Sequence, residues 1–112
     1  MINALQGADT VIAVTEPTPL GAHDLDLILS LLDLFALGGT VVLNRADLPG
    51  ARDAIHASAR RHNRAMAGEI AMDDFLVKSY AAGLPVVRKY PHAPSAAAFV
   101  RLAGELAAEY GL

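Results

Sequence analysis

Two short apolar runs, Thr10–Thr15 and Gly39–Leu43, constrain the fold of this chain most strongly. Both are rich in β-branched residues and predict strands. The first run has no clean alternation of apolar and polar residues, which indicates a strand covered on both faces, as in a parallel sheet. The second run predicts a buried strand, and a weaker third strand is expected over residues 65–72.

Helical segments separate and follow these strands. The first is the last turn of a helix at Ala4–Leu5, which Gly7 ends, and two full helices are expected at Asp24–Phe35 and Ala51–Asn63. A fourth helix is capped by Asp73 and Asp74, runs through Tyr80 and stops at Gly83. Ser95 caps a final helix. Residues 85–87 are expected to be extended. This alternation predicts an α/β fold, with a three-layer, mostly parallel sheet and helices on both faces. Residues 1–112 are enough for one domain with its own core.

The helix expected over residues 24–35 has an uneven surface. Its polar residues Asp26, Ser30 and Asp33 fall on one narrow stripe, which is expected to face solvent. The remaining surface is apolar almost all round, so the helix is predicted to be largely buried. Asp24 is well placed as its N-cap.

Charge and composition exclude several classes of function. The 112 residues carry a net charge of −3 and no overall basic field, so nucleic acid is not an expected partner. The absence of cysteine excludes a disulfide framework, and also a thiolate metal site or iron–sulfur cluster held by this segment. No run approaches the roughly 18 apolar residues of a membrane span, and no secretion signal is recognisable. The chain is expected to be cytoplasmic.

The group Asn44-Arg45-Ala46-Asp47 directly follows the second predicted strand. It therefore lies at the carboxyl end of that strand, where open α/β sheets bind ligands. The Asn44 amide carries a donor and an acceptor and could pair with two atoms of an adenine edge. The alternative is an asparagine whose side chain caps the following turn. The sequence contains no G-x-x-x-x-G-K-[ST] loop that would hold nucleotide phosphates.

Other polar groups favour structural roles. Glu16, His23 and Asp24 could suggest metal binding or acid–base chemistry, but no further ligand has suitable spacing. The helix at residues 51–63 has a basic face. A solvated surface is favoured there over nucleic-acid contact, because no aromatic residue interleaves with the charges. The remaining histidines are scattered and expected to be exposed to solvent: His56, His62 and His92.

Four segments carry a family likeness. Gly7–Leu25 contains G-A-D, an apolar strand, T-E-P-T-P, a small loop and H-D-L. Val41–Asp47 is a strand followed by N-x-x-D. Gly68–Asp73 is similar to the motif G-x-I-P-x-D, and Ala82–Val87 is similar to A-x-G-x-P-V-V. Together, the four segments resemble the MinD/ParA-type P-loop ATPases. The likeness is greatest to the subgroup with an inserted ferredoxin-like iron–sulfur domain, and it covers almost the whole chain.

The resemblance implies the carboxyl-terminal, base-side half of a MinD-like nucleotide-binding domain, a partial P-loop NTPase fold that lacks the P-loop half. The residues implied to contact an adenine nucleotide are Asn44, Arg45, Asp47 and Met72. Asp47 would mainly shape the loop, and Arg45 would either stack on the base or be solvated. Two residues depart from the family pattern, since Arg45 replaces a usual lysine and Ala71 a usual proline.

The resemblance also implies cofactors and partners. The intact protein would bind ATP with Mg²⁺ and could carry a 4Fe–4S cluster outside this chain, whereas the chain alone should not hydrolyse ATP. Without the amino-terminal P-loop half, one edge of the strand Thr10–Thr15 would be exposed. This predicts a homodimer formed by strand pairing or by exchange of an element. The alternative function is a non-catalytic interaction module that pairs with itself or with a P-loop partner.

Overall fold

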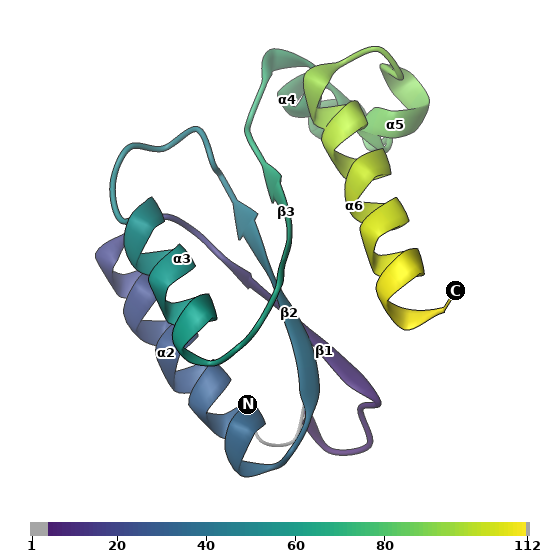
Figure 1. Ribbon diagram of the computed structural model, residues 1–112. Coiled ribbons are helices and arrows are strands. Elements are labelled where there is room, and N and C mark those ends of the chain that lie inside the picture. The colour runs from purple at the N-terminus through teal and green to yellow at the C-terminus, as the bar shows by residue number, and fades with distance from the viewer. Residues whose placement is uncertain (1–4, 112) are drawn as a thin grey trace.

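Strands and helices alternate along the chain in the computed structural model, which describes residues 5–111 (Figure 1). The elements are β1 (Thr10–Thr15), α2 (Pro19–Leu34), β2 (Gly38–Asn44), α3 (Arg52–Arg61), β3 (Met66–Ile70), α4 (Asp74–Ala82), α5 (Val86–Lys89) and α6 (Pro94–Tyr110). The three strands form one parallel sheet in the order β1-β2-β3. The predicted α/β fold with a parallel sheet is confirmed.

The parallel register brings the carboxyl ends of the strands to one edge of the sheet. Thr15 at the end of β1 lies opposite Leu43, and Asn44 at the end of β2 lies opposite Ile70 at the end of β3. The loops that follow the three strands therefore meet at this edge, where the motif that begins at Asn44 was expected to work.

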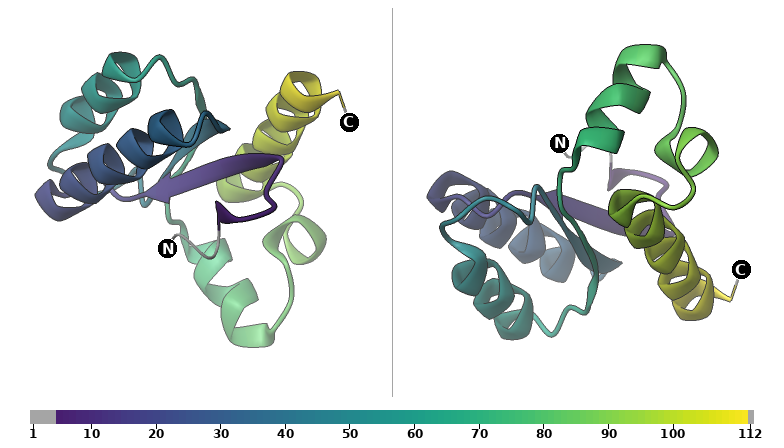
Figure 2. Two further views of the ribbon diagram at one scale, coloured as in Figure 1. Left: turned by 90° about the horizontal axis from the view of Figure 1, so that it is seen from below. Right: turned by 90° about the horizontal axis from the view of Figure 1, so that it is seen from above.

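Helices α2 and α3 lie side by side on one face of the sheet, and α6 lies on the other (Figures 1 and 2). We call the face under α2 and α3 the closed face. Its buried residues are Ala13, Leu25, Leu29, Leu32, Val41, Leu43, Ile55 and Ala59. The three leucines recur at helical spacing on α2, and burying each stabilises the fold by about 1.5–3 kcal/mol.

An ionic cluster joins α2 to α3. Asp26 Oδ1 accepts hydrogen bonds from Ser58 Oγ at 3.0 Å, Arg61 Nη2 at 3.0 Å and His62 Nε2 at 3.1 Å. The second ring nitrogen of His62 faces the Asp33 carboxylate. The predicted polar stripe stays exposed to solvent, with 44% of the Asp26 and 45% of the Asp33 side chain accessible, although its carboxylates also pair with α3 along that side of α2. The prediction that His62 is exposed is wrong, since only 15% of its side chain is accessible.

The outer side of α2 is the surface that meets solvent. Leu27 and Leu34 are 51% and 75% exposed, so the prediction of a largely buried helix is wrong. The sheet covers one side of α2, and α3 packs along its polar side. No layer among residues 5–111 therefore covers these leucines.

The opposite face of the sheet is only partly covered. Helix α6 packs on β2 and β3 around a small cluster: Val42, Ala67 and Ile70, with Ala98, Leu102 and Leu106 against them. On β1 the same face is open, since Ile12 is 45% and Val14 63% exposed, while Ala13 and Thr15 point into the closed face. The prediction that β1 is covered on both faces is therefore wrong within residues 5–111. We call this side the half-open face.

Helix α2 begins five residues earlier than predicted. Thr18 is its N-cap, with the side-chain oxygen accepting a hydrogen bond from the Gly21 amide at 2.9 Å, and Pro19 occupies the first turn. A capping threonine followed by proline is a favoured helix start. Asp24 is thus not the N-cap. A Cβ at position 21 would lie 2.3 Å from the Glu16 carbonyl oxygen, so this close approach requires glycine.

The carboxyl-terminal helices also differ in detail from expectation. Asp73 caps α4 as predicted, accepting from the Leu76 amide at 2.7 Å. Pro94 rather than Ser95 begins α6, because proline suits the first turn of a helix. Residues 86–89 form the short helix α5 and are not extended, since Pro85 sets the chain up for a helical turn.

The amino-terminal prediction falls partly outside the described residues. Ala4 lies outside them, and only Leu5 of the predicted helix end is described. Gly7 has a φ of 77°, the left-handed conformation expected of a glycine that ends a helix.

Candidate functional site

The loop after β2 turns toward β3 immediately beyond Asn44. Arg45 has a φ of 51°, a left-handed conformation that is uncommon for residues other than glycine. The Ala46 amide then donates to the Ile70 carbonyl oxygen at 2.9 Å, which extends the contact between the two strands past their ends. The backbone thereby directs the side chains on either side of Ala46 to the carboxyl edge of β3.

Asp47 joins the loop after β2 to the loop after β3. Its Oδ1 atom accepts a hydrogen bond from the Met72 amide at 2.8 Å. The same carboxylate accepts two bonds from the Arg45 guanidinium, with Nη2 at 3.0 Å and Nε at 3.3 Å. The structure thus brings Arg45, Asp47 and Met72 together, and the contacts of Asp47 are those of a residue that shapes the loop.

The charges of this pair are mutually stabilised. The Arg45 guanidinium, and next to it the Met72 amide, lower the pKa of Asp47 to about 2. The Asp47 carboxylate in turn raises the pKa of Arg45. Neither group is therefore suited to exchange protons near neutral pH. The stacked and the solvated role of Arg45 both stay predictions, and the structure adds that Asp47 holds its guanidinium in a bidentate ion pair.

The side chain of Asn44 lines a different space. It contributes to a cleft of about 360 Å³ between the ends of β1 and β2 and the start of α2. The other lining residues are Val14, Thr15, Glu16, Thr18, Leu20, Gly21 and Asp24. Within residues 5–111 the Asn44 side chain makes no hydrogen bond, to the following turn or elsewhere. Asn44 therefore lines a cleft to which its sequence neighbours Arg45 and Asp47 do not contribute.

The loop after β1 also contributes to this cleft, which was not predicted. Glu16 and Thr18 form part of its wall, although Glu16 was given only a structural role. The loop is held in place because its Pro17 carbonyl oxygen accepts from the Ala51 amide at 3.0 Å. A Cβ on Gly50 would lie 2.7 Å from the same oxygen. The Thr-Pro pair that starts α2 was the sequence signal for this arrangement.

The remaining candidate groups do not form a separate site. Within residues 5–111, no cluster of three or more His, Cys, Asp or Glu side chains could hold a metal ion. Part of the basic face of α3 is paired, since Arg52 and His56 contact Glu69 at 2.6 and 3.4 Å. In the same part of the chain, no helix combines the length and apolar character needed to cross a membrane.

Comparison with known proteins gives structural matches only. No protein-family model matches the sequence. No curated protein matches it either. Among solved structures, the cell division ATPase MinD of Pyrococcus furiosus aligns with 94% of this chain at 25% identity and a TM-score of 0.75. MinD of Pyrococcus horikoshii OT3, solved with Mg-ADP, aligns with 94% at 23% identity and 0.75. A ParA family ATPase of Chlorobium tepidum TLS aligns with 94% at 20% identity and 0.71.

The fold is that of part of a MinD/ParA-type ATPase. The chain spans less than half the length of these relatives, covering 45%, 44% and 43% of their chains, respectively. It resembles the carboxyl-terminal part of the MinD-like ATPases. The predicted partial P-loop fold is therefore confirmed. The likeness to the iron–sulfur subgroup stays a prediction.

Proposed function

We propose that this chain is the adenine-nucleotide-binding portion of a MinD-like ATPase. The observation that carries the proposal is the Asp47 carboxylate, which fastens the loop after β2 to the Met72 amide in the loop after β3. Both loops are thereby fixed at the carboxyl edge of the sheet, the place where open α/β folds bind their ligands.

The side chains at this edge suit an adenine base. The Asn44 amide offers a donor and an acceptor and has no hydrogen-bond partner among residues 5–111. The Arg45 guanidinium is planar and already oriented by Asp47, so it can stack on a ring at little entropic cost. Met72 is 37% exposed on the neighbouring loop and can supply an apolar contact to the ring.

Nucleotide hydrolysis belongs, in this proposal, to the intact protein. Phosphoryl transfer needs phosphate-cradling amides, a lysine and a magnesium site, and the sequence has no P-loop to supply them. The groups present here fit the base but not the triphosphate or its Mg²⁺ ion. An iron–sulfur cluster would also have to be held elsewhere, because the chain has no cysteine. The MinD structure solved with Mg-ADP supports an adenine nucleotide as the ligand of this fold.

Titration of the purified chain with ATP, ADP and GTP, followed by amide NMR shifts, tests the proposal. Adenine nucleotides should shift the amides of Asn44, Arg45 and Met72, with an affinity on the order of millimolar because only the base is held. Asn44→Ala should abolish these shifts, whereas Asp53→Asn on the exposed start of α3 should leave them unchanged. Equal shifts with GTP, or none with any nucleotide, would contradict adenine binding.

The alternative function is a non-catalytic interaction module, and the exposed side of β1 favours it. Strand β1 pairs only with β2, so its other edge has no strand partner among residues 5–111. The side chains of Ile12 and Val14 on its half-open face are also exposed. In this second proposal two copies associate through β1, by strand pairing or exchange of an element.

The mass of the chain in solution as a function of concentration tests this second proposal. A dimer should form at high concentration, and Val14→Lys should reduce its formation because a charge on an edge strand opposes pairing. Val100→Lys is a matched control, because Val100 on α6 is 64% exposed and Val14 is 63% exposed. A monomer at every concentration would contradict the proposal.

A further inference from the structure

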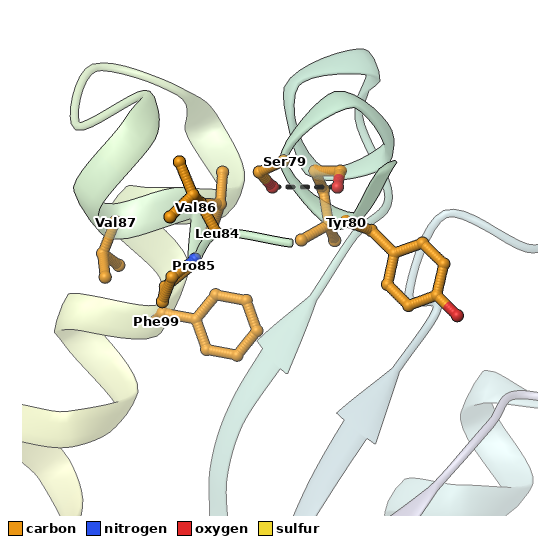
Figure 3. A pocket seen from close by; sticks show the side chains of 8 residues that line it. Ser79, Tyr80, Leu84, Pro85, Val86, Val87 and Phe99 are labelled. Carbon is orange, nitrogen blue, oxygen red and sulfur yellow. Dashed lines mark hydrogen bonds between the residues drawn. The ribbon is translucent and has the colours of Figure 1, made fainter. Parts of the chain in front are cut away.

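An apolar groove lies between α4, α5 and α6, and it shares no lining residue with the cleft at Asn44 (Figure 3). Its volume is about 300 Å³. The lining side chains come from all three helices and the turn between α4 and α5: Leu76, Ser79, Tyr80, Leu84, Pro85, Val86, Val87 and Phe99.

The lining offers almost no polar group to a ligand. Ser79 is buried, and its hydroxyl already donates to the Leu76 carbonyl oxygen at 2.9 Å, the dashed line in Figure 3. Several apolar side chains remain in contact with solvent, with Leu84 and Val87 each 40% exposed and Tyr80 88% exposed. Clustered apolar exposure of this kind marks an interaction surface more often than a plain solvent face.

The groove is built on a fixed frame. Asp73 accepts hydrogen bonds from the Leu76 amide in α4 and from the Ser95 amide in α6, at 2.7 and 2.8 Å. A third bond comes from the Ser95 hydroxyl at 3.0 Å. Phe75 and Tyr90 add an aromatic contact with ring centroids 5.2 Å apart. One carboxylate thus holds the first turns of two helices together, so the groove is formed before any partner arrives.

Charge is unevenly distributed along the chain. Residues 74–101, which contain α4, α5 and the first half of α6, carry four basic residues and one acidic residue, Asp74. The basic residues are all exposed: Lys78, Arg88, Lys89 and Arg101. With the Asp73 carboxylate of the groove frame included, the groove region has a net charge of +2 with His92 neutral, whereas the whole chain has −3. A partner for this region should be acidic around an apolar centre.

We propose that this groove docks an amphipathic helix of a partner protein, with acidic residues beside its apolar stripe. The apolar side chains of such a helix would enter the groove, and its carboxylates would face the basic residues of α4, α5 and α6. A small molecule suits the groove less well, because no convergent polar groups would orient it. A lipid surface is flat, whereas this surface is concave and accepts protruding side chains.

Binding of two designed peptides to the full chain tests the proposal. The first is a helical peptide of about 18 residues with leucines on one face and glutamates elsewhere, long enough to be helical alone. The second has lysine at every glutamate position. The acidic peptide should bind saturably and shift the amides of Ser79, Leu84 and Val87. The basic peptide should bind at least about tenfold more weakly.

Variants separate groove binding from nonspecific attraction. Leu84→Glu places a carboxylate in the mouth of the groove and should reduce acidic-peptide affinity by at least about tenfold. Val77→Glu is the matched control, since Val77 is 53% exposed on α4 but does not line the groove, and should bind nearly as the wild type does. The double variant Arg88→Glu/Lys89→Glu should reverse the preference between the two peptides.

Three results would overturn the proposal. One is equal binding of the two peptides, and another is equal loss of binding in Leu84→Glu and Val77→Glu. The third is binding to vesicles of anionic phospholipid that Leu84→Glu weakens, with no binding of the acidic peptide. Amide spectra of every variant should match the wild type away from the substitution, which excludes misfolding as the cause.

Discussion

The two faces of the sheet are completed to different degrees. On the closed face, α2 and α3 bury a continuous core and are joined by hydrogen-bonded charges around Asp26 and His62. On the half-open face, α6 covers β2 and β3 but leaves Ile12 and Val14 of β1 in solvent. On this face, the large apolar strand side chains left exposed within residues 5–111 are those of β1, one of the two edge strands of the sheet.

This difference separates a face that is complete within residues 5–111 from one that leaves apolar side chains exposed. The closed face needs nothing further, because its core residues reach near-complete burial. The half-open face and the groove between α4, α5 and α6 both expose apolar side chains in contiguous sets. Stability should therefore depend mainly on the closed face, and association mainly on the other side of the molecule.

The largest effect should come from truncating the closed-face core. Leu29 is fully buried, so Leu29→Ala should lower the free energy of unfolding by about 2–5 kcal/mol in urea denaturation. Leu102→Ala on the partly covered face should cost clearly less, since Leu102 is only partly buried. Leu27→Ala, at a site 51% exposed, is the control and should change stability by about 0.5 kcal/mol or less. If Leu29→Ala and Leu102→Ala lowered the free energy of unfolding equally, the two faces would not differ in their contribution to stability.

A smaller effect should come from the carboxylate that joins α4 to α6. Asp73→Ala removes an N-cap and both bonds to Ser95, and should cost about 0.5–2 kcal/mol. Burial alone would raise the pKa of Asp73, but hydrogen bonds from Leu76 and Ser95 bring it below its usual value. Hydrogen exchange should accelerate in α4 and the start of α6, and not in α2. Asp74→Ala, next to it and exposed, should have little effect.

The smallest effect is a pH dependence specific to the closed face. Contact with Asp33, and then with Asp26, raises the pKa of His62 above 6.5. The folded state holds the His62 proton more tightly than the unfolded state. The stabilisation from His62 is therefore fully present below pH 6.5 and is lost as pH rises through the folded pKa. Urea midpoints measured from pH 6 upward should fall, and His62→Gln should flatten the decline. His92→Gln, at an exposed site, should not.

The carboxylates of the same cluster act in the opposite direction. Arg61, then His62, lowers the pKa of Asp26 from 3.8 to about 2. The stabilisation from Asp26 is therefore present above pH 3.8 and is lost as pH falls toward 2. Between about pH 3.8 and pH 6.5 both contributions are present, so the contact between α2 and α3 should be most stable there. If amide exchange in α4 and α6 changed with pH as it does in α2 and α3, the effect would not be confined to the closed face.

Local sequence signals predicted the parts of the fold that depend on neighbouring residues. The apolar β-branched run at Thr10–Thr15 gave the bounds of β1. Asp73 before a helical segment gave the cap of α4. The position of Asn44 at the end of a strand gave the location of the candidate site, because the carboxyl end of a strand is defined by the strand itself.

Contacts between distant residues could not be predicted in this way. Asp47 and Met72 were both candidates, but the sequence did not show that the carboxylate of one accepts from the amide of the other. The polar stripe of α2 was correctly expected to meet solvent, but no local pattern reveals that its carboxylates also pair with α3 and His62. The open face of β1 was missed for a related reason, since an apolar run indicates burial without showing which layer provides it.

The loops at the carboxyl edge are fastened to one another before any ligand is present. Ala51 binds the Pro17 carbonyl oxygen, and Asp47 binds the Met72 amide, so the loops after all three strands form one connected rim. A ligand arriving at this rim need not wait for a loop to close. Its association rate should therefore be set by diffusion and orientation, and differences in affinity among ligands should lie in how fast they leave.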